Sequence, residues 1–160
     1  MGAISSTTET DTESIVSNNI LFSCKLIERC IELEIPLIYA SSASVYGKKS
    51  GNCHELRDLH NFKPLNFYSK SKLIADEFLK ENIKKKAPII GLRYFNVYGL
   101  NEDHKLGMAS PIHSFFKQLK SNGSCKIFGS FDGYRKGEHI RDFVSVNDCV
   151  SINIWAMKKK

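Results

Sequence analysis

Apolar residues early in the chain recur with the spacing of an amphipathic helix. Those that share one helical face are Ile20, Cys24, Ile27 and Ile31. A period of about 3.6 residues is the main sequence signal of a half-buried helix. Ser17 or Asn18 could cap this helix at its N-terminus, and Pro36 follows its end. Residues 37–40 are then a continuous apolar run, which predicts a short buried strand.

The same two patterns alternate further along the chain. Residues 68–84 carry an apolar stripe of helical period, which predicts a second helix that Pro88 terminates. Residues 89–95 predict the next strand. Residues 111–120 predict a third helix, and the Asn-Gly pair at 122–123 is a typical helix end.

The last part of the chain is less regular. It predicts short strands at 126–128 and 142–144, then a helix at 146–157 with Ser145 or Asn147 as its cap. Since strands and helices alternate before this region, the fold class is predicted to be α/β with a parallel, doubly wound sheet.

Composition and charge narrow the function classes. The chain is 42% hydrophobic and 25% charged, which is ordinary for a soluble globular protein. Its net charge of +6 comes partly from lysine runs at 84–86 and 158–160. Such runs are found in nucleic-acid-binding proteins, but they also suit solvated helix ends, and no nucleic-acid-binding motif accompanies them. We therefore expect no nucleic-acid partner, and a positive site could attract a nucleotide diphosphate instead.

Three further features of the sequence argue against a disulfide-bonded, a metal-binding and a membrane-spanning protein. The five cysteines form no CxxC pair and their number is odd, which favours reduced thiols and a cytoplasmic location. The five histidines show no metal-ligand spacing, so no metal is expected. No stretch reaches the ~20 apolar residues of a membrane span, and the first residues do not resemble a signal peptide.

A Tyr-x-x-x-Lys pattern opens the second predicted helix. Tyr68 and Lys72 lie four residues apart, so they share one helical face and the ammonium can approach the phenol. A nearby cation favours the phenolate, and we expect it to lower the pKa of Tyr68 toward the working range. Such a pair can move a proton at a sugar hydroxyl. Alone the pattern is weak, because Tyr and Lys often fall at this spacing by chance.

Polar residues at neighbouring strand ends strengthen this hypothesis. Ser42 follows the first predicted strand, and residues 93–99 end the second. Ligands of doubly wound sheets bind at the carboxyl ends of the strands. A serine there can hydrogen-bond the oxygen that changes charge during redox chemistry, although such serines also simply cap turns.

Three motifs in this order resemble the extended short-chain dehydrogenase/reductase family. They are SSxSVYG from Ser41, PLNxYxxSK around Tyr68 and RYFNVYG from Arg93. Within that family, segments 2–9, 102–110 and 141–144 are similar to the ADP-glyceromanno-heptose 6-epimerase branch. The resemblance covers nearly the whole chain.

The resemblance implies roles for individual residues. The implied catalytic residues are Ser42, Tyr68, Lys72 and Lys105. The implied contacts to NADP are Gly2, Ala3, Ile4, Ser5, Asn18, Lys72, Val97 and Lys105. The implied contacts to the substrate are Asn96, Gly107, Ser114, Phe128, Gly129, Ser130, Phe131 and Arg141. Arg141 would hold the substrate diphosphate by a charge-assisted bond.

The sequence departs from the family pattern in places. The family often has Ser where Gly107 stands and His near Ser114, and residues 132–139 form an insertion-like stretch. No Gly-rich nucleotide loop of the G-x-G-x-x-G type occurs. We therefore expect an incomplete Rossmann-like domain over residues 1–100. Residues 101–160 would begin a small α+β substrate domain and include a returning Rossmann-like segment.

The implied activity is epimerisation at C6 of ADP-heptose for the lipopolysaccharide core, with bound NADP. The full-length protein would be a homo-oligomer that binds no membrane. Two alternatives stay open. One is another nucleotide-sugar enzyme of the family, such as a UDP-galactose epimerase or a dehydratase. The other is a non-catalytic remnant, or one half of a split enzyme, because the Gly-rich half is missing.

Overall fold

The computed structural model describes residues 3–7, 9–48, 56–83 and 88–158 of the chain. The chain forms two compact units: Met1–Tyr94 with Asn153–Lys160, and Phe95–Ile152. The sequence predicts a domain boundary of the whole protein after residue 100. That boundary stays a prediction. None of the helices in the described parts has the length and apolar character needed to cross a bilayer.

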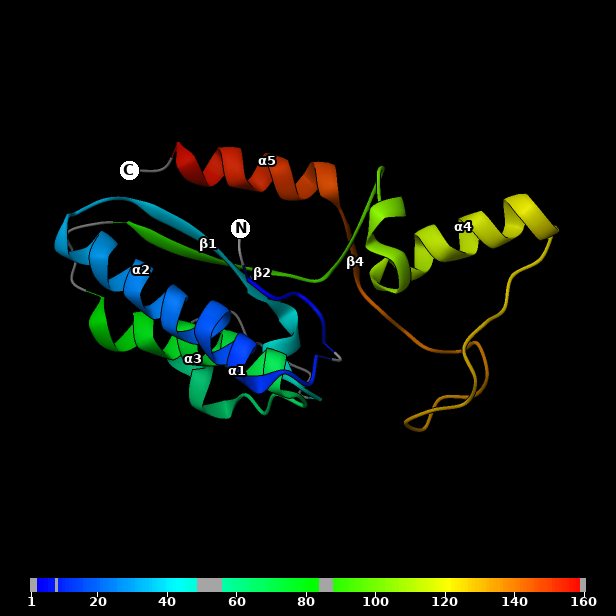
Figure 1. Ribbon diagram of the computed structural model, residues 1–160, viewed down its shortest axis with the longest axis horizontal. Coiled ribbons are helices and arrows are strands. Elements are labelled where there is room, and N and C mark those ends of the chain that lie inside the picture. The colour runs from blue at the N-terminus through cyan, green and yellow to red at the C-terminus, as the bar shows by residue number, and fades with distance from the viewer. Residues whose placement is uncertain (1–2, 8, 49–55, 84–87, 159–160) are drawn as a thin grey trace. The chain divides into compact units, whose positions relative to one another are not determined.

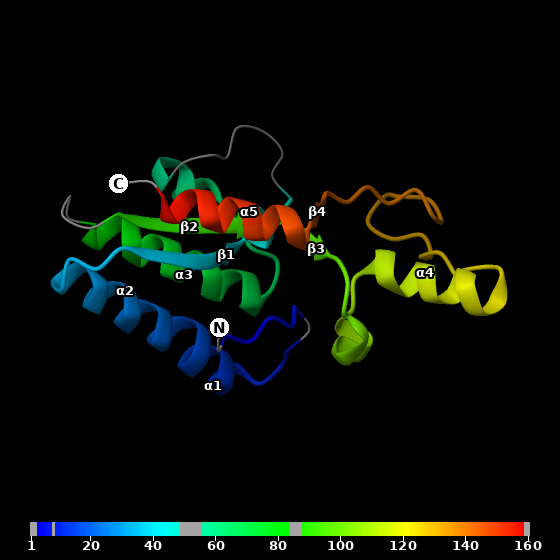
Figure 2. The ribbon, with the colours of Figure 1, turned by 90° about the horizontal axis from the view of Figure 1, so that it is seen from above.

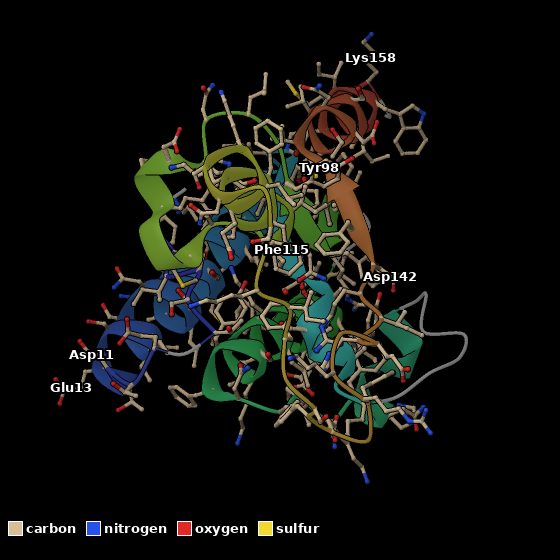
Figure 3. All side chains as sticks on the ribbon, turned by 90° about the vertical axis from the view of Figure 1, so that its right-hand side faces the viewer. Asp11, Glu13, Tyr98, Phe115, Asp142 and Lys158 are labelled. Carbon is tan, nitrogen blue, oxygen red and sulfur yellow. The ribbon has the colours of Figure 1, made fainter. Side chains whose placement is uncertain are left out.

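The first helical segment of the first unit starts earlier than the sequence predicts. Helix α1 (Thr12–Ile15), a π-helix (Val16–Leu21) and α2 (Phe22–Glu32) follow one another without a break. The cap is Asp11, whose carboxylate accepts from the Ser14 amide at 3.0 Å, and Figure 3 shows Asp11 at this end of the chain. The prediction of a cap at Ser17 or Asn18 is therefore wrong, because both residues lie inside the helical segment.

Helix α3 (Phe67–Asn82) joins two parallel strands in sequence. Asn66 caps it, since its side chain accepts from the Ser69 amide at 2.8 Å. Strands β1 (Leu37–Ser42) and β2 (Ile89–Tyr94) pair in parallel, with Ser42 opposite Tyr94 at their carboxyl ends. A strand, a helix and a parallel strand form the βαβ unit that the alternating pattern predicts. The expected α/β class is confirmed.

The core of this unit lies between the sheet and helices α2 and α3, which cover the same face (Figures 1 and 2). One buried cluster joins Ile27 and Cys30 of α2, Leu79 of α3 and Ile89 of β2. Each element therefore contributes its apolar face to a shared interior, and this packing holds the last turns of α3 against the beginning of β2.

A second cluster supports the segments that follow β1. The 3₁₀ helix Ala43–Tyr46 places Val45 in contact with Leu59 and Phe62, next to a further 3₁₀ turn at Leu56–Asn61. Leu73 on α3 belongs to the same cluster. The loop after the SSxSVYG motif is thus packed against α3.

The second unit contains strands that the sequence only partly predicts. Strand β3 (Asn96–Tyr98) pairs in parallel with β4 (Phe143–Ser145), which leads into α5 (Val146–Met157). A 3₁₀ segment (Asp103–Met108) precedes α4 (Pro111–Asn122). The strand expected at 126–128 is absent from the structure, and this prediction is wrong.

Candidate active site

The structure brings the expected catalytic residues of the first unit together. Ser42 ends β1, and Tyr68 and Lys72 lie on the first turns of α3. The Lys72 ammonium lies 5.9 Å from the centroid of the Tyr68 ring and donates to the Ala40 carbonyl at 3.1 Å. A strand end and a helix start thus present a hydroxyl, a phenol and an ammonium to one place.

The pKa of Tyr68 is shifted in the direction opposite to the one expected from the sequence. Burial raises the pKa of Tyr68, and a hydrogen bond with Ser42 only partly opposes the rise. The expected lowering of the Tyr68 pKa by Lys72 is therefore wrong for the chain in this state. The reason is that burial outweighs the other influences and the ammonium is directed at the Ala40 carbonyl. Burial also lowers the pKa of Lys72, while the charge of Asp76 opposes that shift.

A buried carboxylate, not anticipated from the sequence, holds the surrounding elements together. Asp76 accepts hydrogen bonds from the Tyr39 hydroxyl at 2.6 Å, Ser41 Oγ at 3.1 Å and Arg93 Nε at 2.9 Å. These donors come from β1 and β2, and Asp76 lies one helical turn after Lys72. The network therefore fixes the rotation of α3 relative to the strand ends.

The segment expected to touch the cofactor is tied to the same helix. The side chain of Asn19 accepts from the Ile4 amide at 2.8 Å and donates to the Ile4 carbonyl at 3.0 Å. It also donates to Ser71 Oγ at 3.2 Å, next to Lys72. Asn18 is exposed, and its side chain donates to the Ser14 carbonyl at 2.9 Å.

Asn19 therefore anchors this segment. The expected NADP contact of Asn18 is a separate role and stays a prediction. Asn19 is fully buried within the π-helix, where an extra residue per turn changes which side chains face inward. Ala3 and Ser5 flank the anchored Ile4, and Gly2 lies outside the described residues.

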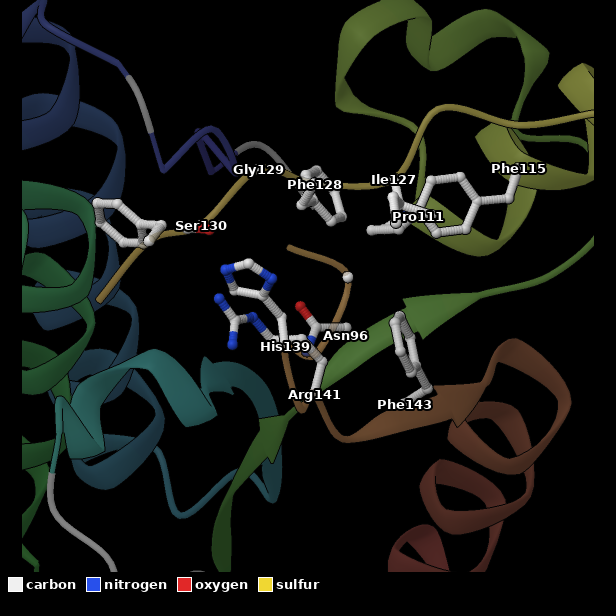
Figure 4. Close-up of a pocket in the computed structure, with 12 residues that line it drawn as sticks. Asn96, Pro111, Phe115, Ile127, Phe128, Gly129, Ser130, His139, Arg141 and Phe143 are labelled. Carbon is white, nitrogen blue, oxygen red and sulfur yellow. The ribbon is translucent and has the colours of Figure 1, made fainter. Parts of the chain in front are cut away.

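The second unit contains a cavity of about 440 Å³. Six of the eight expected substrate contacts line it: Asn96, Phe128, Gly129, Ser130, Phe131 and Arg141. Figure 4 labels Asn96, Phe128, Ser130 and Arg141 of this set, and it shows them with Phe115, His139 and Phe143 around the same space. The Asn96 amide is oriented by a bond from Nδ2 to the Asp142 carbonyl at 2.8 Å.

Two of the expected substrate contacts do not reach this cavity. Gly107 lies in the exposed 3₁₀ segment, and Ser114 lies on α4 without lining the pocket. The cavity also has lining residues that no sequence motif indicated. Two of them are Ile127 and His139.

Lys105 and Val97 also belong to the second unit. The ammonium of Lys105 lies 3.7 Å from the Glu102 carboxylate, and its side chain is 40% exposed. Val97 pairs with Val144 in the short sheet. Among the residues that the structure describes, no group of His, Cys, Asp and Glu could hold a metal ion.

The family model for NAD dependent epimerases and dehydratases matches residues 2–160. The chain belongs to the NAD-dependent epimerase/dehydratase family. Among curated members of this family, the ADP-L-glycero-D-manno-heptose-6-epimerase of Alkalilimnicola ehrlichii is 45% identical over 158 residues. The match covers 98% of the present chain and 48% of that protein, so the chain spans about half the length of such relatives.

Solved structures of epimerases share the fold. The ADP-L-glycero-D-manno-heptose-6-epimerase of Helicobacter pylori matches with a TM-score of 0.83 and 34% identity, over 99% of this chain and 48% of that one. UDP-glucuronic acid 4-epimerase from Bacillus cereus, solved with UDP-glucuronic acid and NAD, matches with a TM-score of 0.72 and 30% identity, over 99% and 48%. Rossmann-type epimerases are thus the structural relatives of this chain.

Proposed function

We propose that the protein containing this chain is an ADP-glyceromanno-heptose 6-epimerase that uses NADP. The observation that carries the proposal is the convergence of Ser42, Tyr68 and Lys72 at the carboxyl end of β1. Doubly wound sheets bind their ligands at this edge. The relatives at 40–45% identity carry the same name, which favours this substrate.

The residues present fit one end of a nicotinamide dinucleotide. The buried Lys72 ammonium uses one of its three donors on the Ala40 carbonyl, which leaves two for ribose hydroxyls. The backbone around Ile4, anchored by Asn19, would form a second contact, and Val97 a third. The bound dinucleotide would supply the hydride acceptor and donor of the reaction. The choice of NADP over NAD is part of the proposal.

Protein residues would carry out the proton transfer. Tyr68 would take the proton of the heptose C6 hydroxyl and return it, while Ser42 would hydrogen-bond the same oxygen. Inversion requires that the ketone be reduced from its other face. Lys105 would serve as the second acid/base group, and its exposed ammonium is paired only loosely with Glu102.

The cavity of the second unit would take the nucleotide end of the substrate. It combines aromatic walls with the Arg141 guanidinium, and its volume is within the range of small-molecule sites. Arg141 is suited to the diphosphate, because a guanidinium binds such groups through charge-assisted bonds. A cytoplasmic homo-oligomer stays part of the prediction.

The competing candidate is another nucleotide-sugar epimerase, since UDP-sugar enzymes share the fold. Turnover of ADP-glyceromanno-heptose and of UDP-galactose by the protein containing this chain would separate the two. We expect epimerisation of the ADP-heptose alone. Preferential turnover of UDP-galactose would replace the substrate assignment, and turnover of neither would favour a non-catalytic remnant.

A further inference from the structure

The cavity of the second unit contains a histidine that the family resemblance does not assign. His139 ends the insertion-like stretch 132–139, and its half-buried imidazole lines the cavity together with Arg141. Figure 4 shows the imidazole and the guanidinium close together at the edge of this space, across from Phe128. An added segment therefore brings a polar ring into the expected substrate site.

One nitrogen of this ring lacks a protein partner. Nδ1 of His139 is buried and has no hydrogen-bond partner among the described residues. Buried polar side-chain atoms rarely lack a partner, so such an atom calls for an explanation. A ligand that enters the cavity would provide one.

Aromatic neighbours hold the ring but do not satisfy that nitrogen. The His139 ring lies 6.1 Å from the Phe128 ring at 74° and 5.4 Å from the Tyr134 ring at 36°, measured between centroids. These contacts restrict the orientation of the imidazole plane. They hold Nδ1 at a fixed position without a hydrogen-bond partner among the described residues, which lowers the entropic cost of binding a ligand there.

The adjacent guanidinium is also available to a ligand. Nη1 of Arg141 donates to the Ile140 carbonyl at 2.7 Å. No carboxylate in the described part of the chain forms a salt bridge with Arg141, although guanidinium carries five donors. A cation and an imidazole two residues apart, both on one cavity wall, form a site for an anionic oxygen group.

We propose that His139 is a second diphosphate-binding residue. Its Nδ1–H donates to a non-bridging oxygen of the substrate diphosphate, while the Arg141 guanidinium holds the same group. The inference rests on the proposed function, because it assumes that a nucleotide sugar occupies this cavity.

Two substitutions separate hydrogen bonding from ring packing. His139→Phe keeps the contacts with Phe128 and Tyr134 but removes both nitrogens, and His139→Asn keeps an amide N–H near the position of Nδ1. Calorimetric titration of the protein containing this chain with ADP should show about tenfold weaker binding for His139→Phe, the loss expected for one hydrogen bond to a charged group. His139→Asn should recover most of that loss.

Adenosine, which lacks phosphates, is the matched control ligand for ADP. Its affinity should be unchanged by His139→Phe, and an equal loss for adenosine would contradict the diphosphate assignment. An Arg141→Gln variant that binds ADP normally would instead show that this cavity does not bind the diphosphate, which contradicts its role in the proposed function. If Arg141→Gln weakens ADP binding and His139→Phe does not, only the role of His139 is overturned.

A measurement on the unmodified chain guards against misfolded variants. Nitrogen-15 NMR of the imidazole should show a shift of the His139 Nδ1 resonance when ADP is added and no shift with adenosine. An Nδ1 resonance that ADP leaves in place, or a chain that does not bind ADP, would overturn the proposal.

Discussion

The two units of the chain are built in different ways. In the first unit, α2, α3, β2 and the 3₁₀ segments after β1 bury apolar side chains in two clusters. In the described part of the second unit, Cys149 is the one buried apolar side chain, and helix α4 buries none. The second unit is instead ordered by the Glu102 carboxylate, which accepts from the Gly99 amide and from the amide and hydroxyl of Ser110.

This difference matches the tasks that we assign to each unit. Proton transfer requires that Tyr68 and its neighbours keep a fixed geometry, which a packed core and the Asp76 network supply. Ligand binding requires accessible aromatic and polar groups, and the second unit leaves Phe128, Phe131 and Arg141 exposed around its cavity. In the proposed function, the first unit would hold the chemical centre and the second would present the recognition surface.

The largest expected effect compares one tyrosine from each unit. Tyr68→Phe should lower the epimerisation rate about 10³-fold, because it removes the acid/base group and keeps the ring. Tyr98→Phe is the matched control, since the Tyr98 ring packs edge-to-face on Phe143 at 6.4 Å and takes no part in the proposed chemistry. Rate measurements at saturating substrate test this, and equal rates for the two variants would remove Tyr68 from the mechanism.

A second comparison concerns a buried and an exposed carboxylate. Asp76→Ala should lower the free energy of unfolding by about 3–4 kcal/mol, because it leaves Arg93 and two hydroxyl groups without their partner. Asp103→Ala should have little effect, since both Asp103 and its partner Lys117 are solvent-exposed. Chemical denaturation measures both, and similar losses would show that the Asp76 network does not dominate the first unit.

Two adjacent asparagines test the anchor of the N-terminal segment. Asn19→Ala should cost about 2 kcal/mol, because it leaves the backbone groups of Ile4 unpaired. Hydrogen exchange at the Ile4 amide should become faster. Asn18→Ala should change neither quantity, since its side chain is exposed. Faster exchange at the Ile4 amide in Asn18→Ala, and unchanged exchange in Asn19→Ala, would contradict the anchoring role of Asn19.

The smallest effect concerns Glu102 and depends on pH. Burial acts to raise the pKa of Glu102, but the hydrogen bonds from Ser110 and Gly99 outweigh it and bring the pKa below its ordinary value of 4.5. A lowered folded-state pKa adds stability above the unfolded value, and that stability is lost as pH falls through the folded pKa.

Glu102→Gln should therefore cost about 1 kcal/mol at pH 7 and progressively less as the pH falls below about 4.5. Unfolding of both proteins from pH 7 to pH 3 provides the measurement. The other carboxylates are common to both proteins, so the difference isolates Glu102. A constant difference over this range would contradict the pKa direction.

The sequence predicts the packed unit better than the open one. Continuous apolar runs locate β1 and β2, a helical period locates α3, and the motifs place Ser42, Tyr68 and Lys72 at their meeting point. The strand expected at 126–128 fails because its residues bond elsewhere. The Lys126 amide donates to the Gln118 side chain at 2.9 Å, and the Phe128 ring packs 5.8 Å from Phe115.

Local sequence patterns also fail to predict which polar side chains pair with one another in the interior. Asp76 looks like an ordinary helix residue, and its role depends on donors 17 to 37 positions away. Asn19 is fully buried inside a π-helix, whose register the spacing rules of an α-helix do not contain.

The most direct test of the central claim follows the hydrogen at C6 of the heptose. ADP-glyceromanno-heptose with deuterium at C6 would be epimerised by the protein containing this chain, and the product would be examined by mass spectrometry and NMR. If the Tyr68 phenol moves only the hydroxyl proton, the deuterium should be retained at C6 of the inverted product. Replacement of that deuterium by solvent hydrogen would mean that a base removes the carbon-bound hydrogen, which would contradict the proposed chemistry of Ser42, Tyr68 and Lys72.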